Sequence, residues 1–116
     1  MSAQTNLEEG LENLRISLEN IKARDGIIGY ILRGRKSACV DIKDSSQIID
    51  YAILSSAAFD SAEHMTTTFE LGRIKNIVVE GEKVKVLSLT IGNYRISVFM
   101  NKNVDHNAIY KDLRLK

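Results

Sequence analysis

The spacing of apolar residues predicts an amphipathic helix over 5–23. Its apolar residues recur at alternating four- and three-residue steps, which keeps them on one helix face: Leu7, Leu11, Leu14, Leu18 and Ile21. Thr5 and Glu8 can form a capping box that satisfies free amides at the start of the helix. Asp25 and Gly26 are typical of the break that ends it.

A β-hairpin is predicted next, from the segment IIGYILRGRKSACVDI at 27–42. It consists of two short β-rich runs, and the turn sequence RGRK at 33–36 lies between them. Positions 27–32 are apolar on both sides of the run, which is the pattern of a central strand with both faces covered.

A long helix is predicted over 46–70, and it has apolar residues on two sides. Asp44, Ser45 or Ser46 can cap its start. At about 100° per residue, an arc of roughly 160° is wide enough to face a sheet, and it contains Ile48, Tyr51, Ala52, Leu54, Ala58, Phe59, Ala62, Met65 and Phe69. The opposite side carries the polar residues of a solvated face, Asp50, Asp60, Glu63 and His64, but also Ile49, Ile53, Ser56 and Ala57.

After Gly72 the apolar period changes to two, which predicts three strands at about 73–80, 83–91 and 94–100. The short links between them, including Gly92-Asn93, force antiparallel neighbours and hence a meander. A last helix is expected at about 104–114, capped by Asn103 or Asp105, with Ile109 and Leu113 on one side.

The predicted element order is therefore α-β-β-α-β-β-β-α. It indicates an α+β fold in which helices pack on one five-stranded antiparallel sheet, with a profilin-like or longin-like layout. At 116 residues, we expect a single domain over 1–116.

The two-sided helix has two explanations. In one, Ile49 and Ile53 lie under a loop or are isolated exposed residues. In the other, which we favour, that side contacts a second copy of the same helix across a two-fold axis. The first meander strand supports the second explanation, because an edge without proline or bulge invites another strand. The predicted dimer interface comprises Ile49, Ile53, Ser56, Ala57, Asp60, Lys75 and Ile77.

Composition limits the possible partners. The net charge is +1, from 16 basic and 15 acidic residues, which argues against general nucleic-acid binding. Basic residues near the predicted hairpin keep a nucleic-acid or membrane-surface alternative open: Lys22, Arg24, Arg33, Arg35, Lys36 and Lys43. We expect no membrane insertion, because no apolar run approaches the ~18–20 residues that cross a bilayer. The absence of a signal-peptide pattern and the single Cys39 lead us to expect a cytoplasmic protein.

We find no pattern that indicates catalysis. A phosphate-binding loop of the GxxxxGK[ST] form is absent, which argues against a P-loop NTPase. Cys39 is typical of a small core residue, and His64 and His106 lack the spacing of metal ligands. Asp41 alone forms no acid–base pair. We therefore expect no catalytic residue, no metal site and no cofactor, and a protein that is not an enzyme.

The chain resembles the Roadblock / dynein light chain family from about 7 to 113. The resemblance rests on the element order, the helix rich in alanine and serine, and the meander IKNIVVEGEKVKVLSLTIGNYRISVFMNK. The segments GIIGYILRGRKSACVDI and MNKNVDHNAIYKDL are also typical of the family. This resemblance implies a homodimer with paired second helices and a sheet shared by the two chains. It also implies binding to small Ras-like GTPases, or service as a light chain or scaffold in a larger assembly.

Three hypotheses of function follow. The leading one is a dimeric, non-enzymatic regulatory or adaptor protein that binds a small Ras-like GTPase and can modulate its GTP hydrolysis. One way to modulate hydrolysis is to supply an arginine in trans to the active site of the GTPase. Nothing in the sequence singles out one of the available arginines for this role: Arg33, Arg35, Arg73 and Arg95. The alternatives are a structural scaffold subunit and a small-molecule sensor. The absence of Trp, with 4 Tyr and 3 Phe, leaves little aromatic material to line a sensor's pocket.

Overall fold

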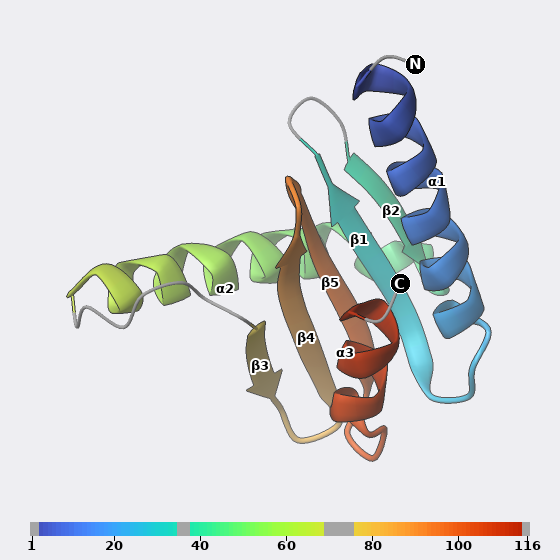
Figure 1. Cartoon of the computed structure of the whole chain (residues 1–116). Helices are drawn as coiled ribbons and strands as arrows, with labels where there is room; N and C mark the ends of the chain where they lie inside the picture. The colour runs from blue at the N-terminus through green and yellow to red at the C-terminus, as the bar shows by residue number, and fades with distance from the viewer. Residues whose placement is uncertain (1–2, 35–37, 69–75, 115–116) are drawn as a thin grey trace.

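Five antiparallel strands form one sheet with helices on both faces (Figure 1). The structure is a computed structural model that describes residues 3–34, 38–68 and 76–114. Its elements are α1 (Ala3–Lys22), β1 (Ile27–Arg33), β2 (Ala38–Ile42), the 3-10 turn η1 (Ser45–Gln47), α2 (Ile48–Thr68), β3 (Asn76–Glu80), β4 (Val84–Ile91), β5 (Tyr94–Asn101) and α3 (His106–Arg114). The predicted α+β class and element order are confirmed.

The strand order across the sheet is β2-β1-β5-β4-β3. It combines the predicted hairpin, β1–β2, with the predicted meander, β3–β4–β5, and the two units meet where β1 pairs with β5. As predicted for 27–32, β1 is paired on both sides and mostly buried. β2 and β3 are the edge strands.

Element ends shift by a few residues from their predicted positions, as is usual for sequence patterns. α1 begins at Ala3, two residues before the predicted start, and α3 begins at His106 rather than near 104. β3 is described from Asn76, so the predicted strand residues 73–75 lie outside the described residues. Gly92 in the β4–β5 turn has a φ of 58°, in the left-handed region that favours glycine at such a tight link.

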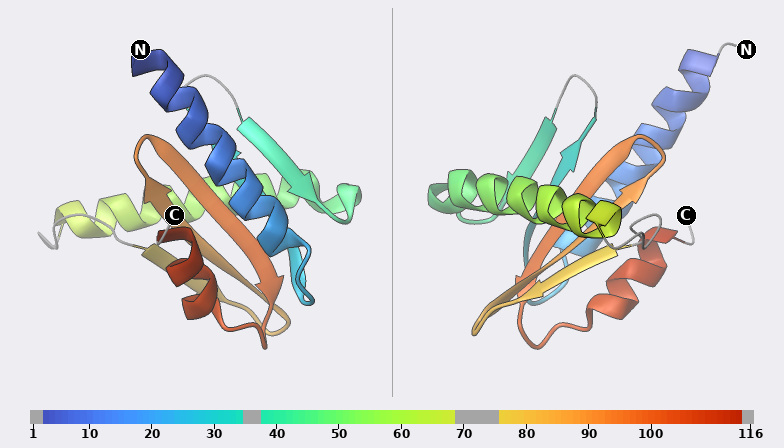
Figure 2. Two further views of the ribbon diagram at one scale, coloured as in Figure 1. Left: turned by 45° about the vertical axis from the view of Figure 1, so that its right-hand side comes forward. Right: turned by 90° about the vertical axis from the view of Figure 1, so that its left-hand side faces the viewer.

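The larger core lies between the sheet and the pair α1 and α3 (Figure 2). Thirteen buried residues of the described part of the chain belong to it, and Leu18, Leu87, Leu89, Ile96, Val98 and Met100 are 0% exposed. The opposite face of the sheet, which α2 crosses, holds a smaller cluster: Ile31, Ile42, Val86 and Phe99, with Ile28 and Tyr51 packed against it. The sheet therefore carries most of its described apolar packing on the α1/α3 side.

Close contact between β1 and β2 depends on Gly29. A register shift between Ile27 and Gly29 marks an irregularity in the pairing of β1 with β5. A Cβ atom added at Gly29 would lie 2.3 Å from the backbone oxygen of Asp41 and 2.6 Å from the Cα atom of Ile42. Because both are backbone atoms, a side chain here would push the two strands apart.

We predict that Gly29→Ala destabilises the fold by about 1–3 kcal/mol, since the added methyl group overpacks the β1–β2 contact. Gly10→Ala is the matched control. Gly10 lies in α1 with nothing within 4 Å of the added Cβ atom, so that change should stabilise the fold by about 0.5–1 kcal/mol. Urea unfolding of both variants measures the two effects. Equal stability of the two variants would contradict the packing role of Gly29.

Candidate protein-interaction surface

Helix α2 begins after a short capped turn. The Asp44 carboxylate accepts hydrogen bonds from the Ser46 amide at 3.1 Å and the Ser46 hydroxyl at 2.7 Å. These hydrogen bonds lower the pKa of Asp44, since they favour its ionised form. Asp44, one of the predicted caps, therefore caps η1, which leads directly into α2.

The sheet-facing side of α2 is formed mainly by small and aromatic residues. Ser55 is 1% exposed and Phe59 is 4% exposed. Tyr51 stacks on Phe99 of β5, with ring centroids 4.5 Å apart. The Arg95 guanidinium of β5 lies over the Phe59 ring, 5.0 Å from its centroid. These contacts place the centre of α2 across the sheet.

Polar groups make up much of the remaining contact between α2 and the sheet. Ser97 lies between two other buried serines, 2.8 Å from the Ser55 hydroxyl of α2 and 2.8 Å from the Ser88 hydroxyl of β4. Arg33 of β1 donates to the Ser56 hydroxyl, and Arg95 forms an ion pair with Glu63. The helix is thus fixed by hydroxyl and guanidinium contacts as well as by aromatic packing.

The prediction that Leu54 and Met65 face the sheet is wrong. Their exposed fractions are 42% and 54%, although Tyr51, Phe59, Ala58 and Ala62 are buried or half-buried as predicted. At about 100° per residue, Leu54 and Met65 both lie at one edge of the predicted arc, whereas Ser55 lies near its middle. The sheet therefore covers a narrower side of the helix than predicted, centred on Ser55 and Phe59. Phe69 and the side chains of Ile48 and Ala52 lie outside the described part of the structure.

The uncovered side of α2 is an exposed apolar and small-residue surface, which we call the outer stripe: Ile53, Leu54, Ala57, Ser61 and Met65. Ile53 is 64% exposed. Among the predicted interface residues, Ile53, Ala57 and Asp60 are exposed, whereas half-buried Ser56 is bonded to Arg33 at the edge of the helix–sheet contact. Lys75 and the side chain of Ile49 lie outside the described residues.

The outer stripe lies close to the free edge of the sheet. α2 packs against β3 and β4, and its C-terminal end extends beyond β3 (Figures 1 and 2). Within the described residues, β3 pairs with β4 alone, so its outer edge is open. On β3, Val79 is 40% exposed and Ile77 is half-buried. The outer stripe thus begins over the centre of the sheet, where Ser55 contacts Ser97 of β5, and the C-terminal end of α2 passes the strand edge that is unpaired in the described residues.

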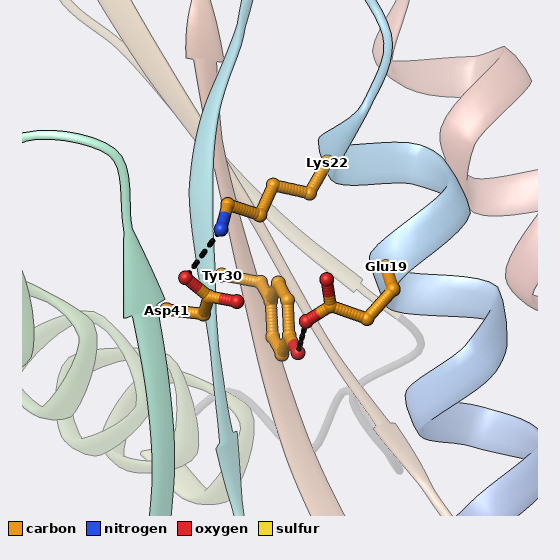
Figure 3. A network of polar contacts seen from close by, with 4 residues as sticks. All are labelled: Glu19, Lys22, Tyr30 and Asp41. Carbon is orange, nitrogen blue, oxygen red and sulfur yellow. Dashed lines mark hydrogen bonds and ion pairs between the residues drawn. The ribbon is translucent and has the colours of Figure 1, made fainter.

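A polar network joins α1 to the other end of the sheet (Figure 3). The buried Tyr30 hydroxyl donates to Glu19 Oε1 at 2.5 Å, and Lys22 forms an ion pair with Asp41 of β2. Burial, followed by the hydrogen bond to Glu19, raises the pKa of Tyr30. The hydrogen bond from Lys22 lowers the pKa of Asp41. The network holds α1 against β1 and β2.

The residues considered for chemistry are scattered. Cys39 is half-buried beside a hollow of about 210 Å³ that also includes Arg15 and Tyr94. His64 is exposed on α2, whereas Nδ1 of His106 lies 3.1 Å from Nζ of the buried Lys85. In the ranges that the structure describes, no three His, Cys, Asp or Glu residues form a group able to hold a metal ion. No described helix is both long and apolar enough to cross a bilayer.

Comparison with known proteins assigns the fold. The sequence matches no family model, and no curated protein is significantly similar to it. The structure is similar to a crystal structure of a Roadblock/LC7 domain from Streptomyces avermitilis, with a TM-score of 0.71 over 86% of this chain and 88% of that one, at 15% identity. The chain has the Roadblock/LC7 fold.

A second solved structure supports this assignment. MglC from Myxococcus xanthus is similar with a TM-score of 0.57, over 88% of this chain and 91% of that one, at 17% identity. The Roadblock-type, longin-like fold that the sequence pattern suggested is thereby confirmed. At these identities the likeness concerns the fold, so partners and activity must be argued from the outer stripe and the β3 edge.

We predict that the Lys22–Asp41 ion pair contributes stability that acid removes. Because the folded-state pKa of Asp41 is lowered, the contribution is complete above the ordinary value of about 4 and is lost as the pH falls through the lower folded value. Asp41→Asn should therefore cost about 0.5–1 kcal/mol at pH 7, allowing for solvent screening, and progressively less as the pH falls below about 4.

Urea unfolding of wild type and Asp41→Asn across this pH range makes the measurement. Asp112→Asn is the control, since it removes the more exposed Arg24–Asp112 pair and should change stability less. A constant difference between wild type and Asp41→Asn at every pH would exclude the ion pair as its source.

Proposed function

We propose that this protein is a two-fold dimer that acts as a non-enzymatic regulatory or adaptor subunit and binds a small Ras-like GTPase. The observation that carries the proposal is the outer stripe of α2 beside the open edge of β3. Large apolar side chains exposed together at a structured surface are typical of an interaction site. Here they lie on the same helix and sheet edge that the family resemblance associates with pairing.

The shape of the outer stripe suits pairing with a second copy of itself. Leu54, Ala57, Ser61 and Met65 follow one another at three- and four-residue steps, so they lie along one side of the helix. The small residues in the middle allow two helix backbones to approach closely. In a two-fold contact the same surface is used by both chains, and the larger residues of one helix can then fill the space beside the small residues of the other.

The β3 edge extends the same contact. Its outward N–H and C=O groups need partners, and an edge strand with apolar side chains readily pairs with another strand. A two-fold axis perpendicular to the sheet would pair two β3 strands in antiparallel fashion and join the sheets. The end of α2 that extends beyond β3 would then lie over the partner's sheet, where it could be covered.

The proposed interface retains the residues expected from the sequence, Ile49, Ile53, Ser56, Ala57, Asp60, Lys75 and Ile77. To these we add the exposed residues Leu54, Ser61 and Met65. Ser56 lies at the margin of this interface, because its hydroxyl is bonded to Arg33 within the chain.

A dimer built in this way offers a GTPase a broad surface made by two chains. The paired helices and joined sheet would form a rigid platform, suited to contact with mobile switch loops. Such a platform can regulate its partner by holding one conformation of those loops, provided that its affinity differs between the GTP and GDP states. The same platform without that difference would serve as a scaffold.

For the dimer, we predict that Ile53→Glu and Leu54→Glu each raise the dissociation constant at least ~100-fold, which corresponds to about 2.8 kcal/mol. The physical reason is that each dimer would bury two unpaired carboxylates. Ile16→Glu on α1 is the matched control, because Ile16 is 51% exposed but lies outside the outer stripe.

Light scattering and sedimentation at micromolar concentration measure the dissociation constants, and all three variants should retain cooperative urea unfolding. A wild type that remains monomeric, or an equal effect of Ile16→Glu, would remove the basis of the proposed dimer.

For the GTPase, we predict binding to a Ras-like GTPase of the same organism with at least tenfold preference for one nucleotide state, or about 1.4 kcal/mol. Titration of candidate GTPases loaded with GDP or with a non-hydrolysable GTP analogue measures it. Leu54→Glu should abolish binding if the surface requires two chains. Equal affinity for both states would favour the scaffold role, and absence of binding to every candidate would refute the GTPase hypothesis.

A further inference from the structure

A small hollow lies at the margin of the larger core, between α1, the β1–β2 hairpin and the start of β5. We call it the α1 hollow. Its volume is about 210 Å³, and its lining includes Leu11, Arg15, Leu32, Cys39 and Tyr94. Leu11, Cys39 and Tyr94 also pack against the larger core, so the hollow opens directly beside it. None of its described lining residues belongs to the outer stripe or to β3, so it is separate from the proposed dimer interface.

The walls of the α1 hollow are held by contacts that need no ligand. On the helix side, Leu18 of α1 is 0% exposed within the larger core. Further along α1, the Lys22–Asp41 and Glu19–Tyr30 contacts tie the helix to β2 and β1. A site for a small molecule is usually preformed in this way, since ordered walls reduce the entropy that binding costs.

The apolar part of the lining suits a short aliphatic group. Leu11 and Leu32 are aliphatic, and Tyr94 is the one aromatic residue among the described lining residues. A cavity of about 150 Å³ with apolar walls is large enough to bind benzene, so the α1 hollow has room for an apolar group of about six carbon atoms. Each methylene group that such a ligand buries fully should strengthen binding about fourfold.

The polar part of the lining suits a negative charge. Arg15 is exposed at the rim of the hollow, and it takes part in no hydrogen bond or ion pair among the described residues. Its guanidinium carries several N–H donors in a planar arrangement that matches a carboxylate. The Tyr94 hydroxyl is a further donor. Because no Asp or Glu is among the described lining residues, the charge of the rim favours an anion.

We propose that the α1 hollow binds a small aliphatic carboxylate. The apolar tail of the ligand lies against Leu11 and Leu32, and its carboxylate accepts hydrogen bonds from Arg15 and Tyr94 at the rim. Inorganic anions lack the tail and aliphatic alcohols lack the charge, so neither satisfies both parts of the lining. The inference adds a small-molecule site to a protein for which only a protein partner is otherwise proposed.

The single cysteine of the chain reports occupancy of the hollow, because Cys39 is part of its lining. The experiment measures the rate at which iodoacetamide, a small uncharged reagent, alkylates Cys39 in the intact protein. Hexanoate at ~10 mM should slow alkylation at least about fivefold, given the millimolar dissociation constant expected of so small a ligand. Acetate, hexanol and sodium chloride at the same concentration should slow it much less. Alkylation of the urea-unfolded protein, the control for the reagent, should be unaffected by hexanoate.

Each of the other results would overturn the proposal. Absence of protection by hexanoate would exclude the site. Equal protection by acetate would exclude the apolar contacts with Leu11 and Leu32, and equal protection by hexanol would exclude recognition of the charge. Since the hollow lies outside the dimer interface, a monomeric chain that binds hexanoate would refute only the proposed dimer.

Arg15→Gln tests the assigned contact with the carboxylate. It should weaken hexanoate binding at least about threefold, the scale of an exposed ion pair, while the weak effect of hexanol stays the same. Arg24→Gln is the matched control, because Arg24 is also exposed but pairs with Asp112 away from the hollow. An unchanged titration of Arg15→Gln, or an equal loss in Arg24→Gln, would overturn the assignment of the carboxylate to Arg15.

Discussion

Helix α2 meets the sheet through the buried pair Ser55–Ser97 and through Tyr51 and Phe59, and the interaction surface depends on the orientation that these contacts hold. Buried hydroxyl groups need hydrogen-bond partners, and here three of them satisfy one another across the helix–sheet contact. With Ser55 and Phe59 turned inward, Leu54 and Met65 are turned outward.

The two faces of the sheet differ in how much apolar packing they contribute to the stability of the protein. The face under α1 and α3 carries an extensive apolar cluster, and the Lys22–Asp41 and Glu19–Tyr30 contacts fix α1 at its far end. Stability of the single chain therefore comes mainly from that side. The face under α2 carries less apolar packing and more polar contact, which leaves the helix available for an intermolecular role.

The Roadblock/LC7 fold brings the second helix and the third strand together at one end of the sheet. In the described residues, α2 exposes apolar side chains and β3 has no strand partner on its outer side, and one two-fold contact could cover both. The proposed activity accordingly belongs to a surface and not to a group of reacting side chains. A regulatory partner held on such a surface would be controlled through its conformation.

Much of the fold follows from local patterns in the sequence. The helical spacing of apolar residues from Leu7 to Ile21 and the two β-rich runs in 27–42 predicted the first helix and the hairpin. The period of two after Gly72 and the short link at Gly92-Asn93 predicted the meander. The open edge of β3 was also predictable, since a meander that begins with that strand leaves one of its sides without a sequential neighbour. The sequence also predicted that the outer side of α2 includes Ile53, Ala57 and Asp60, and the structure shows these three residues exposed.

The orientation of α2 was decided only by the tertiary structure. Hydrophobic periodicity placed Leu54 and Met65 inward, at one edge of a wide apolar arc, because it contains no information about how much of that arc the sheet covers. The sheet places Ser88 and Ser97 under the middle of the helix, and Arg33 and Arg95 along its flank. These residues come from three strands that are far from α2 in the sequence, so their demand for polar partners exists only after the sheet has formed.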